Sequence, residues 1–546
     1  MSYAANPSQQ IELHDRFNNL TKREKKTVME SWAKEFAEEI FPAINEERFS
    51  VLYSGNQATR PNTPINIIIG AMIIKEIQCL TDDEVVMGLM CDIRMQYALH
   101  TTSFEEQPLS DRTFSRFRQR LYEHEQSTGE DLVKAEMVSL AERIAKLMNL
   151  QPHLKRMDSL MIASACKDMT RLEVTYSTVS NLVNAVHKAC GDELLYGMEH
   201  YLNADDQNRV IYHNKAEERM AKIQTIIEDG AALLERLGEI GAELPEYALV
   251  ERMLKDQSEI NAVGERVAKD SHKIAPDSLQ NPSDPEATYR KKAGKGNIGY
   301  TANIVQTFNS EGAAVITDYG FEQNSYSDSE FSKQAIRDIG KTGESTSENK
   351  VTLIGDGAFA GEENDALAKD NHINLVTTSL TGPKPPEIFA DFVIDSEEKK
   401  VVQCPAGFTP QSQGRNQLTD MYRVVMEKDQ CANCPHREEC KAKIQKKSAV
   451  VTVSANMVER AKAVKKISSD EYSEYRNARN AIEGIPSVLR RRYDVDEMPV
   501  FGRIKSKLLF GFKVCAINIK KLVKYTREKY AQNDLSTSPR VECVQI

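Results

Sequence analysis

Two aspartates stand in sequence surroundings that could bring their carboxylates into one site. Asp158 is expected at the end of the short strand-like run HLKRMDSLM, and Asp356 at the end of the apolar run VTLIGDGAF. The carboxyl end of a strand is where an α/β sheet presents functional side chains. A single aspartate at a strand end is more often a turn former or a helix cap, so each residue alone has a purely structural interpretation.

A third acid, Glu483, lies in the segment YSEYRNARNAIEGIPSVLRRRY, which is predicted to be helical. Arg479 is four residues before Glu483 and Arg490 is seven residues after it, so all three can lie on one helix face. The alternative is a surface ion pair between Glu483 and Arg479, worth only about 0.3–0.5 kcal/mol. Pro486 is expected to kink this helix one turn after Glu483.

Four of the ten cysteines form a cluster: Cys404, Cys431, Cys434 and Cys440, with His436 nearby. Cys-x₂-Cys is a chelating half-site, and two further thiols would complete a tetrahedral Zn²⁺ site. A long chain without an export signal should keep its thiols reduced, so clustering favours metal over disulfides. Structural zinc is therefore expected here, with reduced, unliganded thiols as the alternative.

Length and composition indicate an ordinary soluble protein of two or three domains, since 546 residues are too many for one compact core. We expect a cytoplasmic protein without a membrane partner, because the longest apolar run is too short to span a bilayer and the chain begins without a signal-peptide pattern. The net charge of −10 argues against a nucleic-acid partner. However, residues 476–529 hold 14 Lys or Arg and five acids, a local charge of +9. This basic segment fits either DNA contact or a solvated helix face.

The positioning elements follow from apolar spacing. Residues 1–130 are predicted to form a helical N-terminal domain, with a helix start at Thr81 and another at Ser110. The helix after Ser110 carries Arg112, Arg116, Arg118 and Arg120. It could lie on DNA, as in helix-turn-helix modules, or pack with a solvated arginine face.

Residues 150–546 are predicted to form an α/β domain with a mixed sheet. A helical insertion is expected at about 200–275, as two antiparallel helices joined near Pro245, followed by three hairpin strands. Helix, strand, helix and strand then follow, an order that fits an RNase H-like core. A Cys-rich insertion at about 400–450 and the Glu-bearing, basic region at about 470–530 complete the domain.

Several blocks of this sequence resemble bacterial insertion-sequence transposases with a DDE catalytic domain. LKRMDS, IGDGAF and RNAIEGIPSVLRRRY look like the three catalytic blocks, and NPSDPEATYRKKAGKGNIGYTANI looks like the block before the second Asp. TRPNTPINIIIGAMII and LSDRTFSRFRQRL are similar to the helical N-terminal transposase domain. The likeness runs in the expected order from about Tyr53 to Lys524.

The resemblance implies that Asp158, Asp356 and Glu483 are the catalytic, metal-binding acids. Many such enzymes surround the Glu with Tyr-(2)-Arg-(3)-Glu-(6)-Lys; here Arg479 keeps its spacing, Tyr475 is one residue further out, and Arg490 replaces the Lys. The DNA-binding residues expected from this likeness and from the basic segments are Arg479, Arg490, Lys292, Arg112 and Arg116.

Three carboxylates suit two Mg²⁺ ions, which prefer hard oxygen ligands, and Mn²⁺ could substitute. By family likeness Asp158 bridges the two ions. The implied activity is DNA cleavage at transposon ends and strand transfer into target DNA. The expected partners are transposon-end DNA with inverted repeats, target DNA and a second copy of the chain in a synaptic homodimer. The expected location is the bacterial cytoplasm, at the nucleoid.

Three other interpretations stay open from sequence. One is an RNase H-like nuclease that cuts DNA without joining it. Another is a DNA-binding protein descended from a transposase but no longer catalytic, which would have no reason to keep all three acids. The last is a structural, zinc-bearing interaction protein, which would need neither the carboxylates nor the basic segment.

Overall fold

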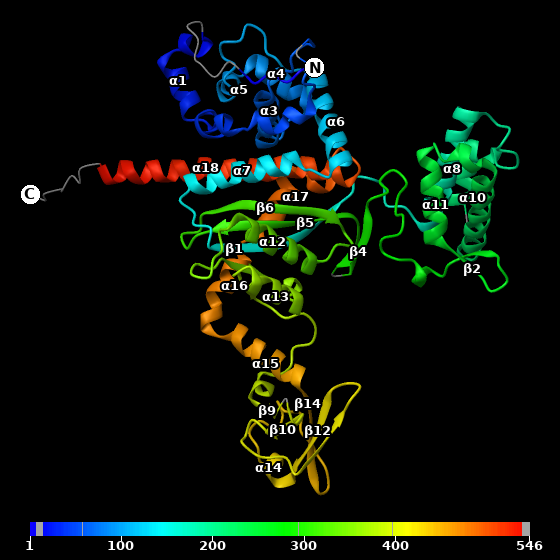
Figure 1. Cartoon of the computed structure of the whole chain (residues 1–546), viewed down its shortest axis with the longest axis vertical. Coiled ribbons are helices and arrows are strands. Elements are labelled where there is room, and N and C mark those ends of the chain that lie inside the picture. Colours follow the sequence, from blue (N-terminus) through cyan, green and yellow to red (C-terminus); the bar gives the residue numbers. More distant parts are fainter. Residues whose placement is uncertain (7–14, 57, 214, 293, 396, 538–546) are drawn as a thin grey trace, which may run out of the picture. The chain divides into compact units, whose positions relative to one another are not determined.

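The structure is a computed structural model that describes residues 1–6, 15–56, 58–213, 215–292, 294–395 and 397–537 (Figure 1). Part of the predicted helical domain (7–14) and one residue of the predicted hairpin turn, Ala293, lie outside the described residues. The chain divides into two compact units. Unit 1 comprises 1–151, 159–327 and 485–546, and unit 2 comprises 152–158 and 328–484.

The N-terminal part of unit 1 is helical. Its elements are η1 Arg16–Asn19, α1 Lys22–Met29, α2 Trp32–Glu35, η2 Phe36–Ile40, η3 Phe41–Ala43, η4 Glu46–Leu52, α3 Ile65–Gln78, α4 Asp82–Cys91, α5 Ile93–Ala98, α6 Asp111–Thr128 and α7 Leu132–Leu147. α3 is buried along almost its whole length, because it is apolar on all sides. α4 begins as predicted, with a capping box between Thr81 and Glu84.

The β-strands pair within each unit. In unit 1, β4 Thr288–Lys292, β5 Lys295–Phe308 and β6 Ala314–Gln323 form the predicted antiparallel hairpins. In unit 2, β7 Thr352–Gly355 pairs in parallel with β8 Asn374–Thr377 and with the first residues of β1 Leu154–Ala163. The last residues of β1 belong to unit 1, where the N–H of Ser164, just after β1, donates to the carbonyl of Ile298 in β5.

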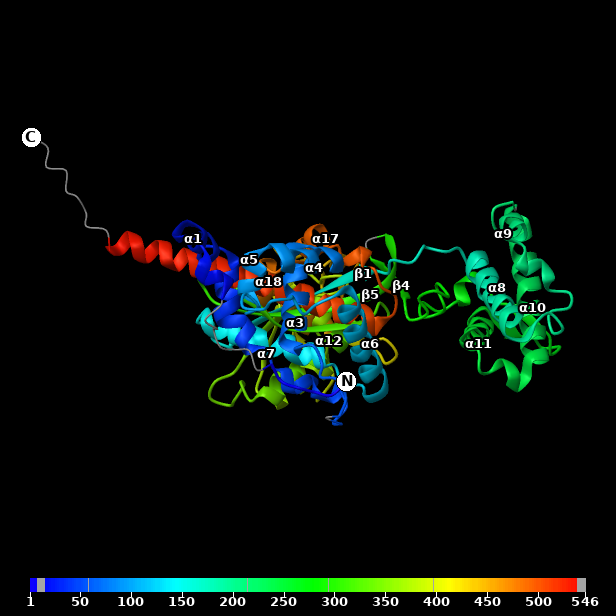
Figure 2. The ribbon, with the colours of Figure 1, turned by 90° about the horizontal axis from the view of Figure 1, so that it is seen from above.

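The helical insertion of unit 1 has its own hydrophobic core, centred on α8. Its elements are α8 Arg171–Cys190, η5 Glu199–Leu202, α9 Ala204–Ile211, η6 Ala216–Glu218, α10 Arg219–Gly241, α11 Pro245–Gln257, β2 Ser258–Ile260, β3 Arg266–Ala268 and η7 Ser271–Lys273. α8, α10 and α11 lie side by side in both views (Figures 1 and 2). The predicted helical insertion of about 200–275 is not helical to its end, because the apolar residues Ile260, Val263 and Val267 lie in or between two short strands. β2 and β3 pair there in a hairpin, whose turn at Gly264 has a positive φ of 91°.

Unit 2 follows β1 with α/β elements and then a β-rich part. The first are α12 Asp328–Thr342, β7, η8 Gly357–Phe359, α13 Glu362–Asp370 and β8. The second are η9 Glu387–Asp391, β9 Val393–Asp395, β10 Lys400–Gln403, β11 Ser412–Asn416, β12 Met421–Glu427, α14 Lys428–Ala432, β13 Lys443–Ile444 and β14 Ser448–Ser454. α15 Ala455–Ser468, η10 Asp470–Tyr472 and α16 Ser473–Asn480 lead to the turn that bears Glu483.

The C-terminal helices are α17 Gly484–Tyr493 and α18 Arg503–Thr537, with η11 Val495–Glu497 between them. α18, red in Figures 1 and 2, packs against α3 and α7 of unit 1. Within the described ranges, no helix combines the length and apolar content needed to cross a membrane.

The prediction of one kinked helix through Glu483 was wrong. α16 ends at Asn480, a turn covers residues 481–483, and α17 begins at Gly484. Pro486 has no N–H to donate to the carbonyl four residues earlier, and its ring would clash with that carbonyl. It is instead accommodated in the first turn of a new helix, where such N–H groups have no partner within the helix.

Candidate functional site

Asp158 lies where β1 separates from β7. The parallel ladder ends with Arg156 opposite Ile354, and each aspartate is two residues further along the chain, Asp158 within β1 and Asp356 just after β7. The prediction that Asp158 ends its strand was wrong, because β1 continues to Ala163. The continuation is favoured by the buried Leu160 and Ile162. Asp158 nevertheless stands at the end of the β1–β7 pairing.

Asp356 directly follows β7, as predicted, and begins a 3₁₀ turn. Its Oδ1 accepts a hydrogen bond from the Ala358 N–H at 2.8 Å, so the capping role is real. The backbone is close-packed at Gly357, where an added Cβ would lie 2.5 Å from the Ser379 carbonyl oxygen. Because the cap uses only Oδ1, the other oxygen, Oδ2, can face a positive charge, and Arg479 Nη2 lies 3.9 Å from it.

Glu483 is held in its turn by buried neighbours and backbone hydrogen bonds. Its N–H donates to the Asn480 carbonyl at 3.1 Å, and the adjacent Ile482 is fully buried. The preceding helix is tied to β1, since Arg156 donates through Nη1 to the Ala478 carbonyl at 2.7 Å. The Glu483 side chain itself is 58% exposed.

Arg479 is the residue that the three carboxylates share. Its Nη2 is 3.4 Å from Asp158 Oδ1 and 3.9 Å from Asp356 Oδ2, and its Nη1 contacts Glu483 Oε1. The Arg479 side chain is only 15% exposed. The predicted i, i+4 pair with Glu483 is therefore present, but it is one part of a charge cluster built from β1, β7 and the turn after α16.

Sequence reasoning missed Arg156. Its side chain is largely buried, and burial lowers the pKa of its guanidinium to about 10. The signal was available, because Lys155 and Arg156 are charged residues inside a strand whose neighbours are apolar, and long cations are rarely buried without a structural reason. Lys155 forms an ion pair with Glu344 at 2.9 Å.

The donor chemistry of the cluster fits a hard divalent cation, because three carboxylates already converge on one positive charge. Across the described ranges, no group of three or more His, Cys, Asp or Glu residues is arranged to hold a metal ion. At the carboxylate cluster this is because the Arg479 guanidinium occupies the space between the oxygens that an ion would use.

The four cysteines line one small cavity of about 20 Å³ in the β-rich part of unit 2. Three of them also pack against its hydrophobic core: Cys404, Cys431 and Cys440. Burial, with the neighbouring cysteines as a second cause, raises the pKa of Cys431 and raises that of Cys440 to about 12. These thiols are therefore stabilised in their neutral form.

The predicted DNA-contact residues differ in what they touch. Arg112 and Arg116 are exposed on α6, whose Phe114 and Phe117 are buried, whereas Arg118 on the same helix is bound to Asp82. Arg112 and Arg116 therefore lie on the solvent-exposed face of α6.

The other two predicted contacts lie in different elements of unit 1. Lys292 is exposed at the end of β4, directly opposite Lys295 of β5. Like charges in opposite cross-strand positions are destabilising, which a polyanion would relieve. Arg490 is paired with Asp496 at 3.1 Å and donates to the Met161 carbonyl at 2.7 Å.

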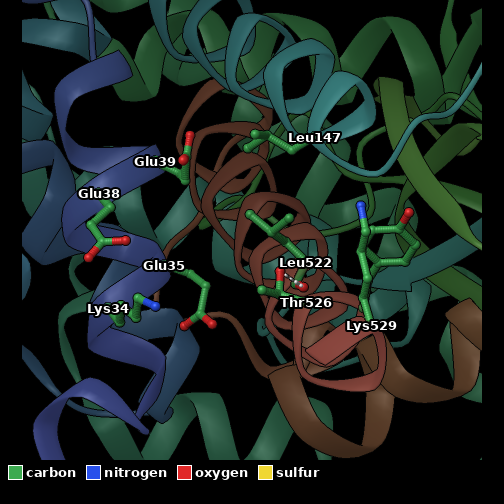
Figure 3. Close-up of a pocket in the computed structure, with 9 residues that line it drawn as sticks. Lys34, Glu35, Glu38, Glu39, Leu147, Leu522, Thr526 and Lys529 are labelled. Carbon is green, nitrogen blue, oxygen red and sulfur yellow. Dashed lines mark hydrogen bonds between the residues drawn. The ribbon is translucent and has the colours of Figure 1, made fainter. Parts of the chain in front are cut away.

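A different group of acids lines a pocket of about 250 Å³ in unit 1 (Figure 3). Glu35, Glu38 and Glu39 come from one short helical segment, and their carboxylates point in different directions. Burial raises the pKa of Glu35, and Glu39 pairs with Arg143 at 2.7 Å. The carboxylates of these three glutamates therefore do not converge on one point.

Two family models match the chain. The model described as a transposase DDE domain matches residues 403–523, and the model described as a transposase domain (DUF772) matches residues 26–120. The first match includes Glu483 and the four cysteines, whereas the two aspartates lie before it. Neither the comparison with curated proteins nor that with solved structures gave a match.

Proposed function

We propose that this chain, which its two transposase domains identify as an insertion-sequence DDE transposase, uses Asp158, Asp356 and Glu483 to cut and join DNA. The observation that carries this proposal is the shared contact of all three carboxylates with Arg479. The three acids come from segments far apart in the sequence. An arrangement that gathers so much negative charge needs a positive partner, and a catalytic site for divalent cations has that requirement.

In the proposed mechanism the three carboxylates would hold two Mg²⁺ ions, for which Mn²⁺ could substitute. When bound, these ions would stabilise the negative charge that develops on the phosphate and make the nucleophile more acidic. In cleavage, water would attack the phosphorus and the 3′-oxygen would leave. In strand transfer, the freed 3′-hydroxyl would attack a phosphodiester of target DNA. The main-chain hydrogen bond to Asp356 Oδ1 orients its carboxylate for this role.

The parallel β1, β7 and β8 and the antiparallel β4, β5 and β6 are consistent with an RNase H-like fold for the catalytic part. For DNA contact we propose Arg479 and Arg490 near the reacting strand, and Lys292, Arg112 and Arg116 along the phosphate backbone. Arginine suits phosphate because its planar fork can donate two hydrogen bonds. Synapsis of two transposon ends would use a homodimer, acting at the nucleoid in the bacterial cytoplasm.

The test is cleavage of labelled DNA that carries the inverted repeats flanking the gene, with Mg²⁺ present. Wild type should cut at the repeat ends, and Asp158→Asn, Asp356→Asn and Glu483→Gln should not. Asp370→Asn, an exposed change at the end of α13, is the matched control and should cut normally. Undiminished cutting by Asp356→Asn, or no cutting by wild type, would contradict the proposal.

The same experiment separates transposase from a nuclease of the same fold. A transposase should also join precut ends to an unrelated plasmid, whereas a nuclease would only hydrolyse them. A transposase-derived protein that had lost catalysis would bind end DNA and do neither.

A second metal role is proposed for Cys404, Cys431, Cys434 and Cys440, which would hold one structural Zn²⁺. The supporting observation is that all four line a single cavity despite the separation of Cys404 from the rest. The Gly407 N–H donates to the Cys404 carbonyl and the Cys434 N–H to the Cys431 carbonyl, tight turns of a kind that can present thiols to a common point. Metal analysis of freshly purified protein should find one zinc per chain. Zinc-free protein of unchanged stability would overturn this role.

A further inference from the structure

We infer that Arg479 is a movable counter-ion that couples the binding of divalent cations to the binding of DNA. The inference rests on the proposed function, and it assigns Arg479 a role beyond contact with a phosphate. In this account its guanidinium leaves the carboxylates when a divalent cation binds, and it then binds a DNA phosphate. Each ligand therefore strengthens the binding of the other.

The first step of the argument is competition for the same atoms. The Arg479 guanidinium contacts one oxygen each of Asp158, Asp356 and Glu483. A divalent cation held by these carboxylates needs the same lone pairs, and it would repel the guanidinium at such short range. Bound cation and the present position of the Arg479 side chain are therefore mutually exclusive.

The second step is that the side chain can move while the backbone stays fixed. The Ala478 carbonyl next to Arg479 accepts the hydrogen bond from Arg156, and Ile482 on the other side is buried. Within the described part of the chain, the Arg479 Nε is buried and has no hydrogen-bond partner. An unsatisfied buried donor costs about 1–3 kcal/mol, so the present position does not satisfy the whole guanidinium.

The third step is the destination. A DNA phosphate offers several acceptor oxygens, and a guanidinium can bind two of them at once. Displacement from the carboxylates by a cation would free the Arg479 guanidinium to bind such a phosphate. By thermodynamic linkage, the factor by which DNA raises cation affinity equals the factor by which the cation raises DNA affinity.

The experiment measures Ca²⁺ binding to chelator-treated full-length protein by titration calorimetry, with and without a duplex carrying the flanking inverted repeat. Ca²⁺ takes carboxylate oxygens, and the readout is affinity, independent of turnover. For wild type, we expect DNA to raise Ca²⁺ affinity about tenfold, or about 1.4 kcal/mol. Arg479→Gln without DNA should already bind Ca²⁺ about tenfold more tightly than wild type, and DNA should add little.

Two further variants exclude simpler explanations. Arg476→Gln removes the same charge three residues earlier in α16, from a side chain that donates to the Ile467 and Ser469 carbonyls. It should leave Ca²⁺ affinity close to that of wild type. Arg479→Lys keeps the charge but lacks the planar fork of the guanidinium, so its Ca²⁺ affinity should lie between those of wild type and Arg479→Gln. It also provides the test if Arg479→Gln does not fold.

Three results would overturn the coupling role: Arg479→Gln and wild type binding Ca²⁺ equally without DNA, an equal gain in Arg476→Gln, or undiminished coupling by DNA in Arg479→Gln. Failure of the proposed function would look different. In that case Ca²⁺ affinity would be the same in wild type and Asp158→Asn.

Discussion

The carboxylate cluster and the cysteine cluster of unit 2 differ in how the negative charge of their side chains is neutralised. Asp158, Asp356 and Glu483 share the guanidinium of Arg479, so their charge is balanced by a side chain. In the cysteine cluster, Cys431 and Cys440 are kept neutral by their own protons, because burial raises the pKa of both thiols. A metal ion would displace an arginine from the first cluster and protons from the second.

This difference indicates different functions. If Arg479 can move away from the carboxylates, its place can be taken by cations and substrate, as catalysis requires. Four thiols that line one small cavity beside a hydrophobic core would hold a metal permanently, as a structural site does. Substitutions in the carboxylate cluster should therefore lower catalysis, whereas substitutions in the cysteine cluster should lower stability.

The largest effect is expected at the carboxylates. Asp158→Asn should lower the rate of end cleavage by about 10³-fold, because cation-mediated charge stabilisation contributes several kcal/mol. The variant should still bind end DNA.

Cys434→Ser should instead lower the melting temperature while cleavage at low temperature stays within a few-fold of wild type. If both variants lost cleavage equally at every temperature, the distinction between the clusters would be wrong.

A smaller effect is expected at Arg156, which acts on the carboxylate cluster through the backbone of α16. Arg156→Met leaves the Ala478 carbonyl without this donor, which should lower the free energy of unfolding by about 1–3 kcal/mol. Cleavage should fall as well, because the segment that carries Arg479 and Glu483 loses its tie to β1. Denaturant titration and cleavage assays measure the two effects, and Arg156→Lys should recover part of both. If Arg156→Met left the free energy of unfolding unchanged, Arg156 would have no positioning role.

The cysteine cluster should respond to pH. A thiol whose pKa is raised on folding favours the folded state while it stays protonated, so this stability is lost as pH rises above the unfolded value. For Cys440 the window runs from its ordinary value of 9.0 to about 12. Zinc-free protein should therefore become less stable as pH rises through this window, and Cys440→Ser should flatten the dependence. Denaturant titrations across the window measure it, and a slope unaffected by Cys440→Ser would exclude this cause.

The smallest effects are expected at the solvent face of α6. Arg112→Gln or Arg116→Gln should weaken binding to any duplex and reduce the slope of log affinity against log salt by about 0.9. Arg118→Gln removes the same charge from a side chain bound to Asp82, so the slope should change less. Equal slopes for all three variants would argue against α6 as a DNA-contacting element.

The order of strands and helices could be predicted from the sequence, because local apolar patterns determine it. Sequence reasoning placed Asp356 after β7 and the helix start at Thr81 correctly. It misplaced the end of β1 although the apolar Leu160 and Ile162 follow Asp158, because the pairing of that part of the strand with β5 is non-local. The same is true of Arg156, whose partner carbonyl is more than 300 residues away in sequence. The domain boundaries and the catalytic roles stay predictions.

The central claim is that Asp158, Asp356 and Glu483 together hold divalent cations. Anomalous diffraction from crystals soaked in Mn²⁺ tests it most directly. We predict peaks bounded by these three carboxylates, with the Arg479 guanidinium moved away from them, and loss of the peaks in Asp158→Asn. A peak bound elsewhere in a crystal of protein that still cuts DNA, or an undisturbed Arg479 beside the carboxylates at saturating Mn²⁺, would contradict the account.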